Sequence, residues 1–328
     1  MGRNMFLNRK AWSCSLLLSG SIILVPFLFG CGTGSGVSVS GGTAADQAAI
    51  LEALDADPFF VDSATQTNVD EEAFAASPAQ VYDGQVPLEA LSTEPWIAEL
   101  PRFWWRGNLE RLGRDIEIHI VNGVADVKIS HEIRGTLFIA DEIDDVLVLW
   151  GKPFEDIVTR YAQFIKKPGG WALTAISPVE FAQSKSDQQS VFIDVLRAYA
   201  GSELLWEATD PSTLHTVTAG LPVFSSGEKV RIEAAVFNTA GSGWEPAQFV
   251  FLHRPGPGIT GRRTRDIMFD DGTNGDRIPG DGIYTRLYTI GPCRGRHFAA
   301  VDVIDAATFT ELQTPYDSGA WGMPYIVE

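Results

Sequence analysis

Aspartate and glycine residues alternate through a short stretch of the sequence that begins at Asp270. Ca²⁺ is bound by about six to eight oxygen ligands on a sharply turning backbone, and this composition supplies both carboxylates and turns. With Asp270 as position one, Asn274, Asp276 and Asp281 fall at positions five, seven and twelve, the spacing of EF-hand-type loops. Gly272 occupies position three, where an EF-hand has an acid, and no helix is predicted on either side. The sequence therefore predicts a calcium loop outside the EF-hand class, with Asp270, Asn274, Asp276 and Asp281 as ligands.

The same stretch has a second interpretation that needs no metal. Asn and Asp side chains accept hydrogen bonds from nearby backbone N–H groups and so stabilise turns by themselves. In either case the stretch joins two predicted strands. Its expected role is to fix a long connection rather than to catalyse a reaction.

His131 is the histidine to which an acid–base role can be given. It follows Val127 and Ile129 at alternate positions of a predicted strand, so it faces the core, where a histidine is usually structural. If the domain encloses a cavity, His131 is the candidate for general acid–base work. The five histidines form no H-E-x-x-H pattern, and the sequence has no G-x-S-x-G, Walker or C-x-x-C motif. These absences favour a protein that is not an enzyme.

The N-terminal stretch is typical of an export signal. A basic start is followed by an apolar run from Ala11 to Gly30. The end of this run, Leu28-Phe29-Gly30-Cys31, resembles the lipobox of bacterial lipoproteins. The resemblance implies that residues 1–30 are removed and that Cys31 is lipidated and attached to a membrane. Gly32, because it is not Asp, favours the outer membrane under the enterobacterial sorting rule. The alternative is an uncleaved helix that spans the membrane.

The net charge argues against a nucleic-acid partner, and the cysteine content argues against an internal disulfide bond. The formal net charge is −17, and loss of the three cations in residues 1–30 takes it to −20. Nucleic-acid binding needs a concentrated basic face, so we expect no nucleic-acid partner. After Cys14 in the signal and the lipidated Cys31, only Cys293 remains, and one cysteine forms no internal disulfide.

A Gly/Ser-rich tether is expected over residues 31–45, and a helix capped by Thr43 is expected to follow it. Further along, Asn122-Gly123 is the centre of a two-residue hairpin turn, which fixes the pairing of the flanking strands. In that register Ile116, Ile118 and Ile120 face Ile129, Val127 and Ala125, while His119 lies opposite Asp126 and Glu117 opposite Lys128. A strand, a turn and a strand are predicted over residues 154–176.

This order of elements, ending in Gly169-Gly170-Trp171-x-Leu173-x-x-Ile176, resembles the NTF2-like (cystatin-like) α+β domains. The resemblance covers about residues 46–180, and we place the domain at 46–182. It implies a curved antiparallel sheet that wraps helices and often leaves a cavity. None of the family's catalytic residues has a match.

The polar residues 183–190 are interpreted as an interdomain linker. About seven strand-like runs without helices follow, one of them at residues 309–313, so residues 191–328 are predicted to form an immunoglobulin-like β-sandwich. The stretch Asp270 to Thr285 resembles the Asp-Gly motif of bacterial extracellular modules called choice-of-anchor X. That resemblance implies a surface or secreted Ig-like domain without catalytic residues.

The favoured function is an envelope-anchored, non-catalytic lipoprotein that serves binding or assembly, with a calcium-stabilised Ig-like domain. An envelope protein or a glycan is the expected partner, besides the membrane held through Cys31. The alternative is a small-ligand carrier or an enzyme that uses a cavity in the NTF2-like domain.

Overall fold

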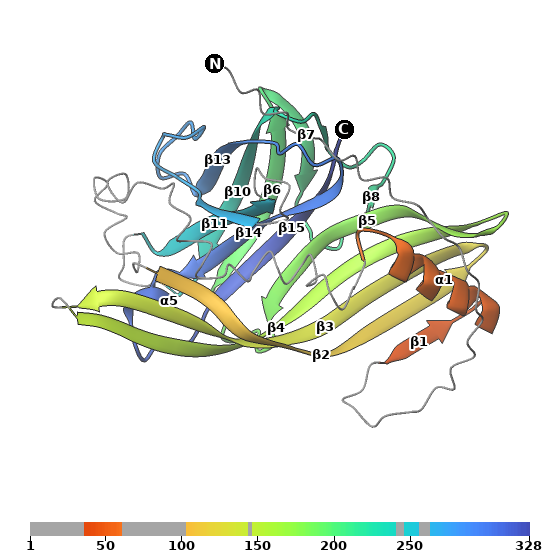
Figure 1. Ribbon diagram of the computed structural model, residues 1–328, viewed down its shortest axis with the longest axis horizontal. Coiled ribbons are helices and arrows are strands. Elements are labelled where there is room, and N and C mark those ends of the chain that lie inside the picture. The colour runs from red at the N-terminus through yellow and green to blue at the C-terminus, as the bar shows by residue number, and fades with distance from the viewer. Residues whose placement is uncertain (1–35, 61–102, 144–145, 241–245, 256–262) are drawn as a thin grey trace, which may run out of the picture. The chain divides into compact units, whose positions relative to one another are not determined.

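The computed structural model describes residues 36–60, 103–143, 146–240, 246–255 and 263–328 (Figure 1). These ranges belong to one compact unit, Gly34–Glu328. The predicted signal and Cys31 lie outside the described residues. Within the described ranges, none of the helices has the length and apolar character needed to cross a membrane.

The first described elements are a short strand, β1 (Val37–Ser40), and a helix, α1 (Ala44–Ala56). β1 pairs in parallel with β2, so at most residues 31–36 are left for the tether predicted over 31–45. The predicted helix cap is confirmed. Thr43 Oγ1 accepts a hydrogen bond from Asp46 N (3.2 Å), and Asp46 Oδ2 accepts one from Thr43 N (3.2 Å). This capping box satisfies two backbone donors that the first turn of the helix leaves without partners.

Four long antiparallel strands follow: β2 (Phe103–Val121), β3 (Val124–Ile143), β4 (Val146–Lys167) and β5 (Gly170–Gln183). The register predicted for the β2–β3 hairpin is confirmed, with Ile118 opposite Val127 and His119 opposite Asp126. Asn122 and Gly123 adopt the positive φ angles, 50° and 78°, that a two-residue turn requires. The strand, turn and strand predicted over residues 154–176 are also confirmed, as parts of β4 and β5.

Most of the later chain is also strand. The elements are β6 (Val191–Ala200), β7 (Glu203–Ala208), β8 (His215–Thr216), β9 (Val223–Phe224), β10 (Lys229–Asn238), β11 (Gln248–Pro255), β12 (Arg263–Ile267), β13 (Ile283–Thr289), β14 (Gly295–Asp305), α5 (Ala306–Thr310) and β15 (Ser318–Val327). The strand predicted at residues 309–313 is wrong. Asp305 Oδ1 accepts a hydrogen bond from Ala307 N (2.9 Å) and so caps α5, which buries Phe309.

Eleven of the described strands form one sheet, whose main path is β1-β2-β3-β4-β5-β15-β14-β11-β12. A second sheet has the order β13-β10-β6-β7. β5 pairs with β15 through Phe181 opposite Ala320, so the large sheet continues across the linker predicted at residues 183–190. The connection itself is held by Asp317, whose carboxylate accepts hydrogen bonds from Ser190 N at 3.1 Å. The two predicted domains therefore share one sheet.

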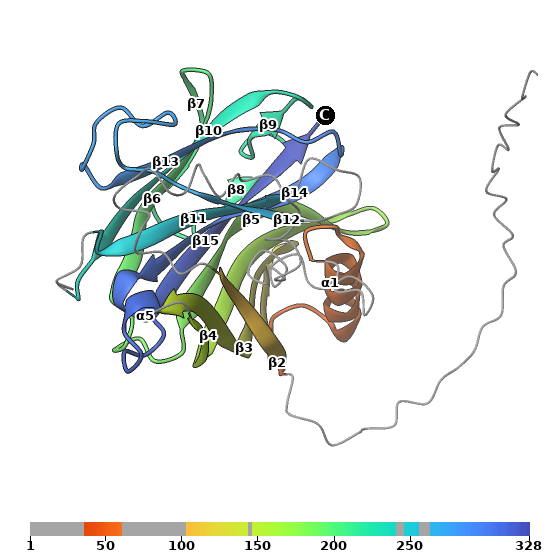
Figure 2. The same cartoon turned by 60° about the vertical axis from the view of Figure 1, so that its left-hand side comes forward.

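Each face of the large sheet contributes to a separate core, as the alternation of side chains along β14 shows. Phe298 and Ala300 belong to the first core, which α1 covers with Ile50 and Leu54. Val301 belongs to the second core, which the small sheet covers from the opposite side (Figure 2). The chain is thus a mostly β protein in which two sheets stack in the C-terminal half.

Candidate functional site

The Asp-Gly loop joins β12 to β13 and is closed at its base by two backbone hydrogen bonds. Phe269 N donates to Thr285 O (3.0 Å) and Thr285 N donates to Phe269 O (2.7 Å). Between them the backbone turns sharply, with φ angles of 51° at Asn274 and 99° at Gly275. A Cβ added at Gly275 would lie 2.8 Å from Leu287 Cγ, so the loop lies closely against β13 at this point. The sequence positions that predict turns thus do form them.

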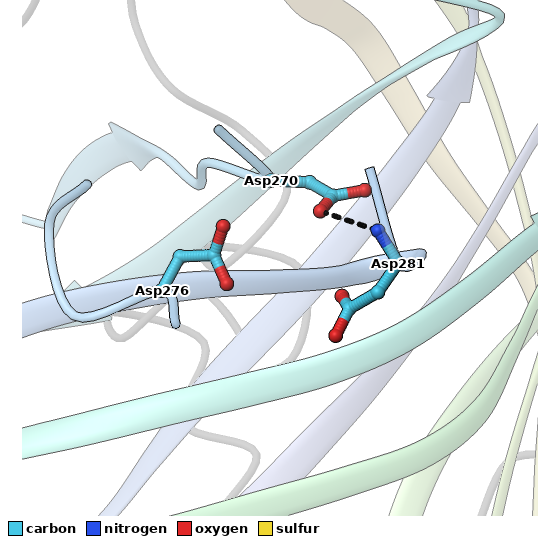
Figure 3. A group of neighbouring side chains, drawn as sticks. All are labelled: Asp270, Asp276 and Asp281. Carbon is cyan, nitrogen blue, oxygen red and sulfur yellow. Dashed lines mark hydrogen bonds between the residues drawn. The ribbon is translucent and has the colours of Figure 1, made fainter. Parts of the chain in front are cut away.

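Three of the four predicted metal ligands converge within this loop. Oxygen atoms of Asp270, Asp276 and Asp281 all lie within 4.8 Å of one another (Figure 3). Backbone donors orient the Asp270 carboxylate, because Oδ1 accepts from Gly280 N (2.8 Å) and Oδ2 accepts from Gly282 N (2.9 Å). The fourth predicted ligand, Asn274, is exposed, and its Nδ2 donates to Thr273 Oγ1 (2.9 Å).

The three carboxylates carry like charges without a cationic side chain in the cluster. Burial raises the pKa of Asp270 above its ordinary value, against the lowering effect of its backbone donors, and the Asp281 charge raises this pKa further. A divalent cation would relieve the repulsion and would suit the oxygen ligands. The interpretation without metal also has support, since Asp276 Oδ2 accepts from Gly272 N (2.6 Å) as a turn-forming aspartate does.

His131, the acid–base candidate, lies on β3 and is mostly buried. Burial lowers the pKa of its imidazole to about 3, and the charges of Arg111, Arg160 and Arg114 act in the same direction. Its Nε2 atom has no hydrogen-bond partner among the described residues. A general acid or base works best with a pKa near the operating pH, so this environment is poorly suited to that role at neutral pH.

Sequence reasoning missed a buried polar network on the face of the sheet that α1 also covers. At its centre the guanidinium of Arg106 on β2 binds Asp302 on β14, through Nη1 to Oδ2 (2.6 Å) and Nη2 to Oδ1 (3.0 Å). Tyr316 accepts a hydrogen bond from Arg106 Nη2 (2.9 Å) and donates one to Asp156 Oδ2 (3.3 Å). His253 Nε2 lies 3.1 Å from Asp302 Oδ2. The network joins strands from both halves of the sequence.

The two carboxyl groups of this network have opposite pKa shifts. Burial alone would raise the pKa of Asp302, but Arg106 and His253 reverse this effect and hold the pKa below its usual range. Burial raises the pKa of Asp156 to about 7, because the more distant Arg106 offsets only part of the loss of hydration. Asp156 Oδ1 has no hydrogen-bond partner among the described residues. One carboxylate is thus charged and paired, while the other is about half protonated near pH 7.

Comparison of this chain with protein-family models, with curated proteins and with solved structures found no match. The likeness to lipoproteins, to NTF2-like domains and to choice-of-anchor X modules therefore stays a prediction from the sequence.

Proposed function

We propose that the protein is an envelope-anchored lipoprotein that serves binding or assembly without catalysing a reaction, and that Ca²⁺ stabilises its C-terminal β-sandwich. The observation that carries the calcium part is the convergence of Asp270, Asp276 and Asp281 within 4.8 Å. The stacking of the small sheet on β11, β14 and β15 supports an Ig-like assignment for residues 191–328. The helix α1 on the long antiparallel strands supports an NTF2-like assignment for residues 46–182.

In this proposal calcium acts on stability. The ion neutralises three carboxylates that otherwise repel one another, and so fixes the long connection between β12 and β13. Asp270, Asp276 and Asp281 supply its carboxylate ligands, and Asn274 can join them by rotating its amide. Extracellular calcium modules bind with dissociation constants of about 10⁻⁴–10⁻³ M, and we expect this range.

Thermal unfolding of the full chain in rising CaCl₂ tests the calcium site. A ligand at about 100 times its dissociation constant adds about 2.7 kcal/mol to the free energy of unfolding, so the melting temperature should rise by several degrees. The double variant Asp276→Asn, Asp281→Asn should lose this rise. Asp271→Asn is the matched control, because Asp271 lies in the same loop but binds Thr273 N (2.8 Å) and is not in the cluster. An unchanged melting temperature at 10 mM CaCl₂ (roughly ten to 100 dissociation constants) would remove the metal from the proposal.

Metabolic labelling with a fatty acid tests the anchor independently. We expect label on the full chain, loss of label in Cys31→Ser, and unchanged label in the control Cys293→Ser. Fractionation should then place the labelled protein in the outer membrane. Label retained in Cys31→Ser would contradict the lipoprotein assignment.

One observation favours a second function, a small-ligand carrier or an enzyme. His131 and Asp156 both lie on the face that α1 covers and both have strongly shifted pKa values, which is common at functional sites. Variants His131→Ala and Asp156→Asn would abolish such an activity. Ligand binding that is unchanged in both variants would exclude a site built on these residues.

A further inference from the structure

A groove with a volume of about 480 Å³ lies on the outward face of the strands β1 to β4. This face is opposite to the one that α1 covers. It carries the polar residues of the β2–β3 hairpin, because side chains alternate along each strand. β1 forms one wall through Ser38 and Ser40, and residues Ser212 and Leu214 of the connection before β8 also line the groove.

The groove carries charges of both signs next to each other. Lys128 Nζ lies 3.3 Å from Glu117 Oε1 across the β2–β3 pair, and both side chains are substantially exposed. Asp126 Oδ1 accepts a hydrogen bond from Gln163 Nε2 (3.0 Å), and Ser40 Oγ lies 2.6 Å from His119 Nδ1. Such a surface offers a cation to an anionic group and carboxylates to a neighbouring cationic group. It matches a zwitterion better than it matches an ion of one sign.

Apolar surface adjoins these charges. Leu214 is 36% exposed, and Tyr161 lines the same groove. A ligand that combines a zwitterionic head with a less polar body would contact both parts.

The few residues between Cys31 and Gly36 limit the distance between the groove and the proposed lipid anchor. Gly36 is fixed on β2, because its N donates to Asp115 Oδ1 (3.0 Å) and its O accepts from Ile116 N (2.9 Å). An extended chain spans at most about 3.6 Å per residue, so Cys31 lies within about 18 Å of Gly36. Ser38 and Ser40, which line the groove, follow Gly36 directly along β1. If Cys31 is lipidated, the groove stays close to the lipid head groups.

We propose that this groove binds the zwitterionic head group of a phospholipid in the membrane that holds Cys31, with the phosphate at Lys128 and the ammonium group at Glu117. The inference rests on the proposed lipid anchor and adds a second, non-covalent contact with the same membrane. A net charge of −20 in the chain without residues 1–30 repels an anionic surface, whereas a zwitterionic head group has no net charge to repel.

Titration of the full-length protein in detergent micelles with dihexanoyl phosphatidylethanolamine tests the groove. We expect saturable binding, detected by chemical shifts or calorimetry, that weakens at least tenfold in the double variant Lys128→Ala, Glu117→Gln. The matched control is Arg134→Ala, Glu155→Gln. This pair is also an exposed cross-strand ion pair, at 3.0 Å on β3 and β4, but does not line the groove, so binding should not change.

Two further ligands separate the alternatives. Equal affinity for dihexanoyl phosphatidylglycerol would show that only the phosphate is recognised, and would overturn the zwitterion assignment. Equal affinity for free phosphoethanolamine would show that the lipid body contributes nothing, and would overturn the membrane source. Binding that weakens equally in the control pair would also overturn the site. Fatty-acid labelling of Cys31 reports on the anchor alone, so failure of the anchor and failure of the groove are distinguishable.

Discussion

The buried network around Arg106 and the acidic loop around Asp270 both bring charged side chains together, but the charges are compensated differently. In the network, the central carboxylate of Asp302 is paired with the guanidinium of Arg106, and both side chains are removed from water. In the loop, three carboxylates lie together near the surface with only backbone N–H groups to compensate them. The central ion pair is therefore compensated within the protein, whereas the loop holds three like charges side by side.

Removal of the central cation of the network should have the largest effect. Arg106→Met leaves Asp302 buried without its guanidinium, and breaking a buried ion pair in this way costs about 3–5 kcal/mol. Urea unfolding should show this loss at neutral pH. The control is Arg197→Met, which breaks the partly exposed pair with Glu207 (2.6 Å) and should cost less than about 1 kcal/mol. Equal losses in the two variants would contradict the central role of the network.

Asp156 should make the stability of the protein depend on pH. Its pKa is about 7 in the folded protein and about 4 in the unfolded chain, so the folded state keeps a proton that the unfolded state loses. The resulting stability is fully present below about pH 4 and is lost as the pH rises through 7, in total on the order of 4 kcal/mol. Asp156→Asn should remove this loss. We expect the variant to gain stability relative to the wild type between pH 5 and pH 8, as measured by urea unfolding. A constant difference across that window would show that Asp156 does not titrate there.

The stability of the loop should depend on its backbone geometry, whereas the stability of the network depends on charge. Gly275→Ala places a Cβ 2.8 Å from Leu287 Cγ at a φ of 99°, and should cost about 2 kcal/mol. Gly280→Ala is the control, because its φ is 73° and nothing lies within 4 Å of the added Cβ, so about 1 kcal/mol is expected. Thermal unfolding in excess EDTA measures both. A smaller loss at Gly275 than at Gly280 would contradict the close contact with β13.

Removal of a charge from the loop should have the smallest effect of all. In EDTA, Asp276→Asn relieves repulsion and keeps an oxygen that can accept from Gly272 N, so stability should stay within about 0.5 kcal/mol of the wild type. The same variant should be less stable than the wild type in millimolar calcium. A large loss in EDTA would instead show that the carboxylate is needed without metal, as Asp302 is in the network.

Interactions between residues close in the sequence were predictable, and those between distant residues were not. The Asn122-Gly123 turn sets the β2–β3 register, and Thr43 and Asp46 set the start of α1. The convergence of Asp270, Asp276 and Asp281 follows from their spacing in one loop. Arg106 and Asp302, by contrast, are 196 residues apart, and neither has a local pattern that marks it as buried.

Other features left signals that were available in the sequence. Val37-Ser38-Val39-Ser40 alternates as a strand does, and Val39 packs on the first core, but the surrounding Gly and Ser residues indicated a tether. Asp305 precedes Ala306 and Ala307 as a helix cap would, but Phe309 and Thr310 favoured a strand. The pairing of β5 with β15 had no local signal, because it joins Phe181 to Ala320. The continuity of the sheet between the two halves of the chain could therefore not be predicted from the sequence.

The position of β15 has a consequence for the order in which the protein matures. β15 follows every other strand of the sheet in the sequence, yet it lies between β5 and β14. Until β15 has been synthesised, β1 to β5 and β11 to β14 cannot join, because the strand that links them is missing. Such late, long-range closure is slow and leaves apolar edges open to self-association. A chaperone that shields these edges until the chain is complete is the kind of helper this topology calls for.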